Sequence, residues 1–136
     1  MRAAVFLVLA LLAGPAVAHK PSDSYLSIAV EDSTVRGQWD IALRDLDFAI
    51  GIDSNGDGDI TWGELRARHN EIAAYALARL TVALDGAACP LRATEHLVDQ
   101  HSDGAYAVMR FEAQCGWTGS ALELGYNLFF DLDPQH

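Results

Sequence analysis

The sequence has few basic side chains. Its 136 residues include 9 Lys and Arg against 19 Asp and Glu, so the formal net charge at pH 7 is -10. A chain with this charge is repelled by the phosphates of nucleic acid and by anionic membrane surfaces, and we expect neither as a partner. The excess of carboxylates favours cations instead. The length fits a single domain.

Long apolar runs are missing beyond the first 18 residues. A transmembrane helix needs about 20 consecutive apolar residues, and the run AAVFLVLALLA at 3–13 has 11. That run follows a basic second residue and precedes an A-x-A pattern at 16–18, which is typical of a secretory signal peptide. We predict that 1–18 is a signal peptide and that 19–136 is one exported domain, periplasmic or extracellular. An uncleaved amphipathic or buried segment is the alternative.

Cysteine is also scarce. The sequence has two, Cys89 and Cys115, with 25 residues between them. Two cysteines in an exported domain of this size suggest one disulfide, and we predict that Cys89 and Cys115 form it. A free pair and metal ligation are the alternatives, although the spacing is not C-x-x-C.

The motifs of several common enzyme classes are absent. The sequence contains no G-x-S-x-G, no H-E-x-x-H and no glycine-rich phosphate loop after a strand. A cysteine pair that is oxidised is not nucleophilic. We therefore do not expect an enzyme.

The hydrophobic pattern predicts a mostly β fold. A period of two residues predicts strands at 24–30 and 34–43, which together form an antiparallel hairpin, and the period changes to that of a helix at 44–52 and 64–80. Further strands are predicted at 81–84, 89–91, 95–101, 105–113 and 121–132, with a tight turn at Asp85-Gly86. The predicted fold is α+β, mostly β: an antiparallel β-sandwich-like sheet with a loop and one substantial helix inserted after the second strand.

The loop at 53–64, DSNGDGDITWGE, is rich in oxygen-bearing side chains. It fits the EF-hand template D-x-[DN]-x-[DN]-G-x5-E at every specified position, with Gly58 at the sharp bend. The predicted ligands are the side chains of Asp53, Asn55 and Asp57, the backbone carbonyl of Asp59, Thr61 through a water, and two oxygens of Glu64. Thr61 to Glu64 also reads T-x-x-E, a capping box, which predicts that the loop leads directly into the next helix.

Calcium is the cation that these ligands favour. Ca2+ takes six to eight oxygen ligands, whereas Mg2+ demands a regular octahedron and keeps its waters. Without a cation, the clustered carboxylates repel one another. An acidic, solvated loop is the alternative. Because the sequence has one such loop and not a pair, Ile60 at position 8 must pair elsewhere, and we expect a weak site with a structural or modestly regulatory role.

Histidines suggest a different kind of metal site. As the first residue of the mature chain, His19 would place its imidazole beside a free α-amino group, a pair that chelates Cu2+ or Ni2+; a flexible terminus without metal is the alternative. His96 and His101 are predicted to face opposite sides of a strand, and His69 is predicted to pack on the apolar stripe of its helix. The large aromatic residues expected in the core are Trp39, Trp62, Tyr25, Tyr106, Phe129 and Phe130.

Several segments resemble a known family. HKPSDSYL (19–26), WDIALRDLD (39–47), ITWGELRARH (60–69), HSDGAYAV (101–108) and LFFDLDPQH (128–136) are similar to the N-terminal exported region of HupE/UreJ-like membrane proteins. The resemblance implies an outer domain that precedes a bundle of membrane helices in a permease for nickel or other metals. It also implies EF-hand-like positions at Asp53, Asn55, Asp57, Asp59 and Glu64.

Together these patterns predict a calcium-binding exported domain related to the outer domain of a membrane metal permease. Because no segment beyond the first 18 residues is long and apolar enough to span a bilayer, transport by this chain alone is not expected. One alternative hypothesis is a periplasmic domain that binds or senses Cu2+ or Ni2+ through His19. Another is a protein-interaction module without metal function, which would use the free backbone edge at Ile60.

Overall fold

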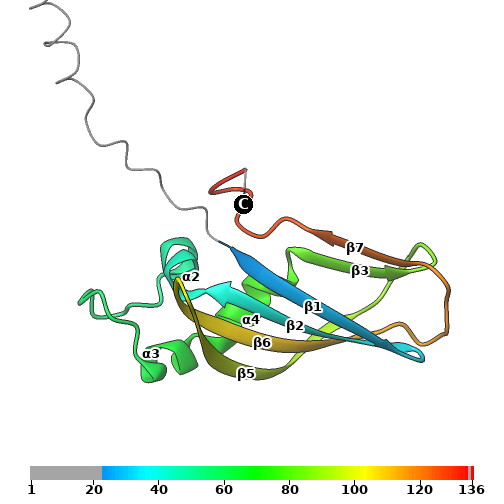
Figure 1. The fold of residues 1–136 in the computed structure, drawn as a ribbon, viewed down its shortest axis with the longest axis horizontal. Coiled ribbons are helices and arrows are strands. Elements are labelled where there is room, and N and C mark those ends of the chain that lie inside the picture. Colours follow the sequence, from blue (N-terminus) through cyan, green and yellow to red (C-terminus); the bar gives the residue numbers. More distant parts are fainter. Residues whose placement is uncertain (1–22, 135) are drawn as a thin grey trace, which may run out of the picture.

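The computed structural model describes residues 23–134 and 136. The predicted signal peptide, 1–18, and the predicted metal ligand His19 lie outside the described residues. Within them the chain forms seven strands and three helices, and the strands divide into two antiparallel sheets (Figure 1). The helices follow the second strand. The predicted fold class, α+β and mostly β, is confirmed.

The larger sheet has the strand order β1-β2-β6-β5. Its members are β1 (Ser24–Glu31), β2 (Thr34–Ala42), β5 (Leu91–His101) and β6 (Gly104–Gln114). Two-residue turns join β1 to β2 and β5 to β6, since Glu31 pairs with Thr34 and His101 pairs with Gly104. The hairpin predicted from the two-residue period of the first strands is therefore confirmed.

The smaller sheet has the order β4-β3-β7 and consists of β3 (Leu80–Leu84), β4 (Ala87–Ala88) and β7 (Leu122–Tyr126). Asp85 and Gly86 form the turn between β3 and β4, and their φ angles are 49° and 81°. Two successive positive φ values are what a two-residue type I′ hairpin requires. The predicted tight turn is confirmed.

Three short helices connect β2 to β3: α2 (Leu43–Ile50), α3 (Trp62–Ala67) and α4 (His69–Leu77). The prediction of one continuous helix at 64–80 is wrong. The N–H of Arg68 donates to the carbonyls of both Glu64 and Leu65, a tightened last turn that ends α3, and α4 begins at His69. No helix within 23–134 and 136 is long and apolar enough to cross a membrane.

One hydrophobic core lies between the larger sheet, the helices and the smaller sheet. Its largest fully buried side chains include Trp39, Ile41, Met109 and Phe111 from the larger sheet, Leu46, Leu65 and Ile72 from the helices, and Val82 from the smaller sheet. The rings of Trp39 on β2 and Tyr126 on β7 meet edge-on, with their centroids 6.3 Å apart. The two sheets thus share a core, as a sandwich does.

Other details of the prediction are wrong: the strands predicted at 89–91 and 95–101 are one strand, β5. Tyr25, Trp62 and Phe130 are not core residues, because 45%, 48% and 40% of their surfaces are exposed. The last strand ends at Tyr126 and not at residue 132. Leu128 and the adjacent Phe129 are both buried, which the alternation of a strand does not allow, and Phe129 has a φ of 60°.

A close approach between β2 and β6 gives a testable prediction. Gly37 pairs with Phe111, and a Cβ at position 37 would lie 2.1 Å from Cζ of that buried ring. Gly37→Ala is expected to lower the free energy of unfolding by about 1–3 kcal/mol through overpacking. Gly125→Ala is the control, because its Cβ would meet its nearest neighbour at 3.8 Å. Urea unfolding measures both, and equal midpoints would contradict the prediction.

Candidate functional site

The predicted calcium loop, 53–64, connects α2 to α3 and is anchored in the core at both ends. Ile52, directly before it, and Leu65, directly after it, are fully buried. Ile60 is at position 8, which would pair with a second EF-hand loop if there were one. Its side chain is partly buried and packs against the same core. The loop is therefore an exposed polar segment whose two ends are fixed by apolar contacts.

Asp47 positions the start of the loop. Its Oδ1 accepts hydrogen bonds from the backbone N–H groups of Ile52 and Asp53, both at 2.7 Å. Gly51 ends α2 in the left-handed region, with a φ of 68°. Sequence analysis missed Asp47. A carboxylate in the last turn of a helix interacts unfavourably with the negative end of the helix dipole. That unfavourable placement is the signal that could have indicated a role outside the helix, such as holding the loop.

Side-chain oxygens organise the turns inside the loop. Asp53 accepts from the N–H groups of Gly56 (2.7 Å) and Gly58 (2.8 Å), one at each carboxylate oxygen. Asn55 Oδ1 accepts from the N–H of Asp57 (2.8 Å), and Asp57 Oδ1 accepts from the N–H of Asp59 (2.9 Å). The three predicted side-chain ligands of the first half thus each hold backbone N–H groups, as Asp and Asn do in turns.

Glu64 closes the loop. Its Oε2 accepts from the N–H (3.0 Å) and hydroxyl (2.8 Å) of Thr61, and Thr61 Oγ1 accepts in turn from the N–H of Glu64, so the predicted capping box of α3 is confirmed. Its Oε1 accepts from the N–H (3.0 Å) and hydroxyl (2.8 Å) of Ser54. The last predicted ligand therefore contacts Ser54, the residue that directly follows the first predicted ligand.

The hydrogen bonds to Glu64 also set its charge. Those from Thr61, followed by those from Ser54, lower the pKa of Glu64 from 4.5 to about 2. Glu64 is therefore ionised at neutral pH. A charged group in this position suits a divalent cation.

Binding of a cation requires the side chains of the loop to rearrange, and that of Glu64 most of all. A carboxylate oxygen has two lone pairs, and each oxygen of Asp53 accepts one hydrogen bond. Each oxygen of Glu64 accepts two. Coordination by Glu64 therefore requires the hydroxyls of Ser54 and Thr61 to rotate away, since hydroxyls rotate freely and backbone N–H groups do not.

The side chains of the loop are not gathered around one point. Among residues 23–134 and 136, one group of three His, Cys, Asp or Glu residues has its ligand atoms all within 4.8 Å, and it is Asp40, Asp99 and His101. The predicted loop ligands do not form such a group. Their oxygens are turned towards the N–H groups of the loop instead.

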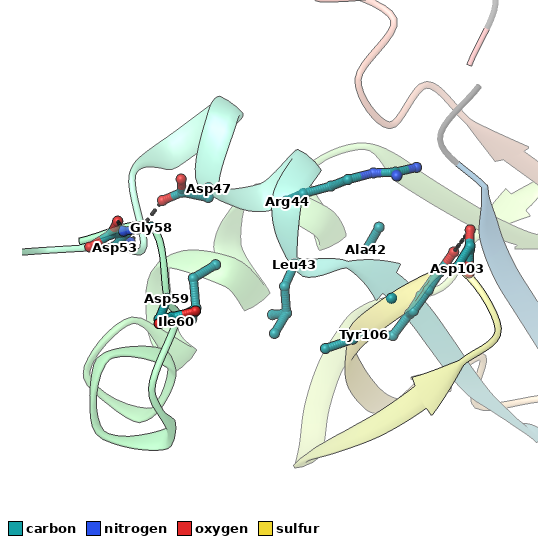
Figure 2. Close-up of a pocket in the computed structure, with 12 residues that line it drawn as sticks. Ala42, Leu43, Arg44, Asp47, Asp53, Gly58, Asp59, Ile60, Asp103 and Tyr106 are labelled. Atoms are coloured by element: carbon teal, nitrogen blue, oxygen red, sulfur yellow. Dashed lines mark hydrogen bonds between the residues drawn. The ribbon is translucent and has the colours of Figure 1, made fainter. Parts of the chain in front are cut away.

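A cleft of about 390 Å³ borders the loop (Figure 2). It lies between the loop, the start of α2 and the turn from β5 to β6. Its lining residues are Ala42, Leu43, Arg44, Asp47, Asp53, Gly58, Asp59, Ile60, Asp103, Gly104, Ala105 and Tyr106. Four aspartates and one arginine give it an acidic character, and the side chain of Asp59 contributes to it although the predicted ligand is the Asp59 carbonyl.

The remaining predicted residues lie elsewhere. Cys89 and Cys115 form the predicted disulfide. His96 and His101 lie on opposite faces of β5, as predicted. His96 stacks on His69 of α4 with ring centroids 4.3 Å apart. Burial is the main cause that lowers the pKa of both histidines below the ordinary value of 6.5, so the neutral form of each predominates at pH 7. The predicted packing role of His69 is confirmed.

No protein-family model, curated protein or solved structure matches this chain. What the loop does must therefore be argued from its own residues and geometry.

The role of Asp47 can be tested without calcium. Asp47→Ala leaves the N–H groups of Ile52 and Asp53 without their acceptor. The unsatisfied N–H of the buried Ile52 is the more destabilising of the two, so we expect a loss of about 1–3 kcal/mol in the free energy of unfolding. Asp47→Asn keeps an acceptor oxygen and should retain most of the stability. Thermal unfolding in EDTA compares the three proteins. An alanine variant as stable as the wild type would show that Asp47 does not hold the loop.

Proposed function

We propose that this chain is an exported domain that binds one Ca2+ in the loop 53–64. The ligands are the side chains of Asp53, Asn55 and Asp57, the Asp59 carbonyl, Thr61 through a water, and Glu64. The observation that carries the proposal is the closure of the loop by Glu64. Its carboxylate reaches Ser54 across the loop, so position 12 already contacts the residue that follows position 1, and this brings the two ends of the loop together.

Three further features support the proposal. The loop ends are fixed by Ile52 and Leu65, which limits the entropy lost when an ion orders the segment. Glu64 is ionised at neutral pH. The acids within the loop have no Lys or Arg partner among the ion pairs of the described residues, so a cation would relieve their mutual repulsion.

The role of the ion follows from the surroundings of the loop. A single loop outside the cytosol is expected to bind calcium with a dissociation constant on the order of micromolar to millimolar. Because the loop joins two helices that pack on the core, the ion would stabilise this connection, with at most a modest regulatory effect. We further propose, on the five segments that resemble HupE/UreJ-like proteins, that such a domain works beside the membrane portion of a metal permease.

Calorimetric titration tests calcium binding. The wild-type protein is expected to bind about one Ca2+, and Glu64→Gln, which removes the charge of the bidentate ligand, should weaken binding at least tenfold. Glu123→Gln is the matched control, since it removes an equal charge from exposed β7. The absence of calcium heat in the wild type, or equal losses in both variants, would refute the proposal.

A further inference from the structure

A second set of metal ligands lies on the larger sheet, on elements that do not include the calcium loop. Asp40 of β2 and Asp99 and His101 of β5 have ligand atoms that all lie within 4.8 Å of one another. These residues are as many as 61 positions apart in the sequence, and the sheet brings them together. Neither the calcium loop nor its proposed function involves them.

The strand register explains this meeting. Asp40 pairs with Val108 of β6, while Asp99 pairs with Tyr106 and His101 with Gly104 of the same strand. Residues two apart on a strand share a face, so all three ligands lie on one face of the sheet.

Aromatic rings hold His101 in place. The ring of Tyr25 stacks on it with centroids 4.9 Å apart, and the buried ring of Tyr106 lies at 4.2 Å. Its Nε2 lies 3.1 Å from Oδ2 of Asp40. Two ligands are thus fixed by packing before any ion binds, which is the condition for a well-organised site.

In the part of the chain that the structure describes, Asp40 is the one charged residue that is buried, and only 7% of its surface is exposed. Gln38 donates to its Oδ1 at 3.0 Å, and its Oδ2 contacts His101, but no Lys or Arg of the described residues pairs with it. A buried carboxylate is costly unless it is paired or coordinates a metal. A second carboxylate, Asp99, lies close by and would add repulsion, whereas a divalent cation would convert that repulsion into attraction.

The separation of two of the ligand atoms is compatible with a tetrahedral metal as well as with a hydrogen bond. In a tetrahedral zinc site with bonds of about 2.0–2.2 Å to nitrogen and oxygen, two neighbouring ligand atoms are about 3.4 Å apart. The separation of His101 Nε2 and Asp40 Oδ2 is 3.1 Å. The ion would take the place of the proton between these atoms, with the imidazole proton then on Nδ1. Asp99 is exposed and can swing towards the ion.

We propose that Asp40, Asp99 and His101 form a site for a divalent transition cation of the zinc type, with water completing the coordination. An imidazole nitrogen with two carboxylates suits such a cation better than Ca2+, which prefers oxygen ligands alone and more of them. The site has three protein ligands and an open position. It does not depend on calcium binding at 53–64.

Zinc titration tests the site. Zn2+ is titrated by calorimetry into the full protein in millimolar Ca2+, so that the calcium loop is occupied. We expect about one Zn2+ per chain, with the affinity reduced at least tenfold in Asp99→Asn and in His101→Gln. It should be unchanged in two controls: His96→Gln on the other face of β5, and His19→Gln at the predicted mature terminus.

Asp99→Asn decides the outcome, because Asp99 is exposed and its replacement should leave the fold intact; near-ultraviolet circular dichroism checks this. Zinc affinity unchanged in Asp99→Asn overturns the three-ligand site, whatever His101→Gln does. An absence of zinc binding in the wild type, or a loss in His19→Gln equal to that in Asp99→Asn, overturns it as well. The visible spectrum of bound Co2+ gives a second readout, which should disappear in Asp99→Asn and persist in His96→Gln.

Discussion

Millimolar calcium is expected to raise the midpoint of thermal unfolding of this protein, and Glu64→Gln is expected to abolish the rise. At a calcium concentration about 100 times the dissociation constant, binding to the folded state adds about 2.7 kcal/mol to the free energy of unfolding. For a domain of this size that corresponds to a shift of roughly 10 °C. The physical source is the loop itself, where Asp53, Asp57 and Glu64 lose their repulsion when an ion binds among them.

Two controls separate specific binding from general screening of charge. Magnesium at the same concentration screens surface charges equally. Its preference for a regular octahedron means that this loop should bind it poorly, so we expect a much smaller shift of the unfolding midpoint. Glu123→Gln should keep the full calcium shift. Equal midpoints in calcium and in EDTA, or an equal shift with magnesium, would contradict the account.

Removal of the disulfide is expected to have the other large effect. Cys89 follows β4 of the smaller sheet and Cys115 follows β6 of the larger sheet, so the bond links the two sheets. The cysteines are 26 positions apart, and opening a loop of that length costs about 3 kcal/mol in the chain-entropy model. The double variant Cys89→Ala, Cys115→Ala should therefore lose about that free energy of unfolding, in addition to a smaller loss from the space left by the buried sulfurs.

Chemical reduction provides the matched experiment. Dithiothreitol should lower the urea midpoint of the wild type towards that of the double variant, and it should have no effect on the variant itself. A wild-type midpoint that does not change once free thiols have been detected would show that the bond between the sheets contributes little.

Local signals in the sequence predicted much of the fold. The two-residue period of 24–43 gave a hairpin, Asp85-Gly86 gave a tight turn, and T-x-x-E gave a capping box, because each is determined by residues close together in the chain. The break at Arg68 and the early end of β7 were not predicted. Both depend on how a segment packs against distant elements, which the period of the pattern does not encode.

The two candidate sites differ in how much of them the sequence could reveal. The proposed calcium loop is contiguous, so its proposed ligand positions follow from spacing alone, whereas the roles of Asp47 and Ser54, which are not ligands in the template, were missed. Asp40, Asp99 and His101 meet because of the register of β2, β6 and β5. No spacing rule predicts that register.

Diffraction from crystals grown in millimolar calcium tests the central claim most directly. The account predicts a single ion in the loop, with the side-chain oxygens of Asp53, Asn55, Asp57 and Glu64 and the carbonyl of Asp59 at about 2.3–2.6 Å. The carboxylate of Glu64 should coordinate the ion and no longer accept hydrogen bonds from the hydroxyls of Ser54 and Thr61. A loop without an ion, in which Glu64 still accepts those hydroxyls and the aspartates face solvent, would contradict it.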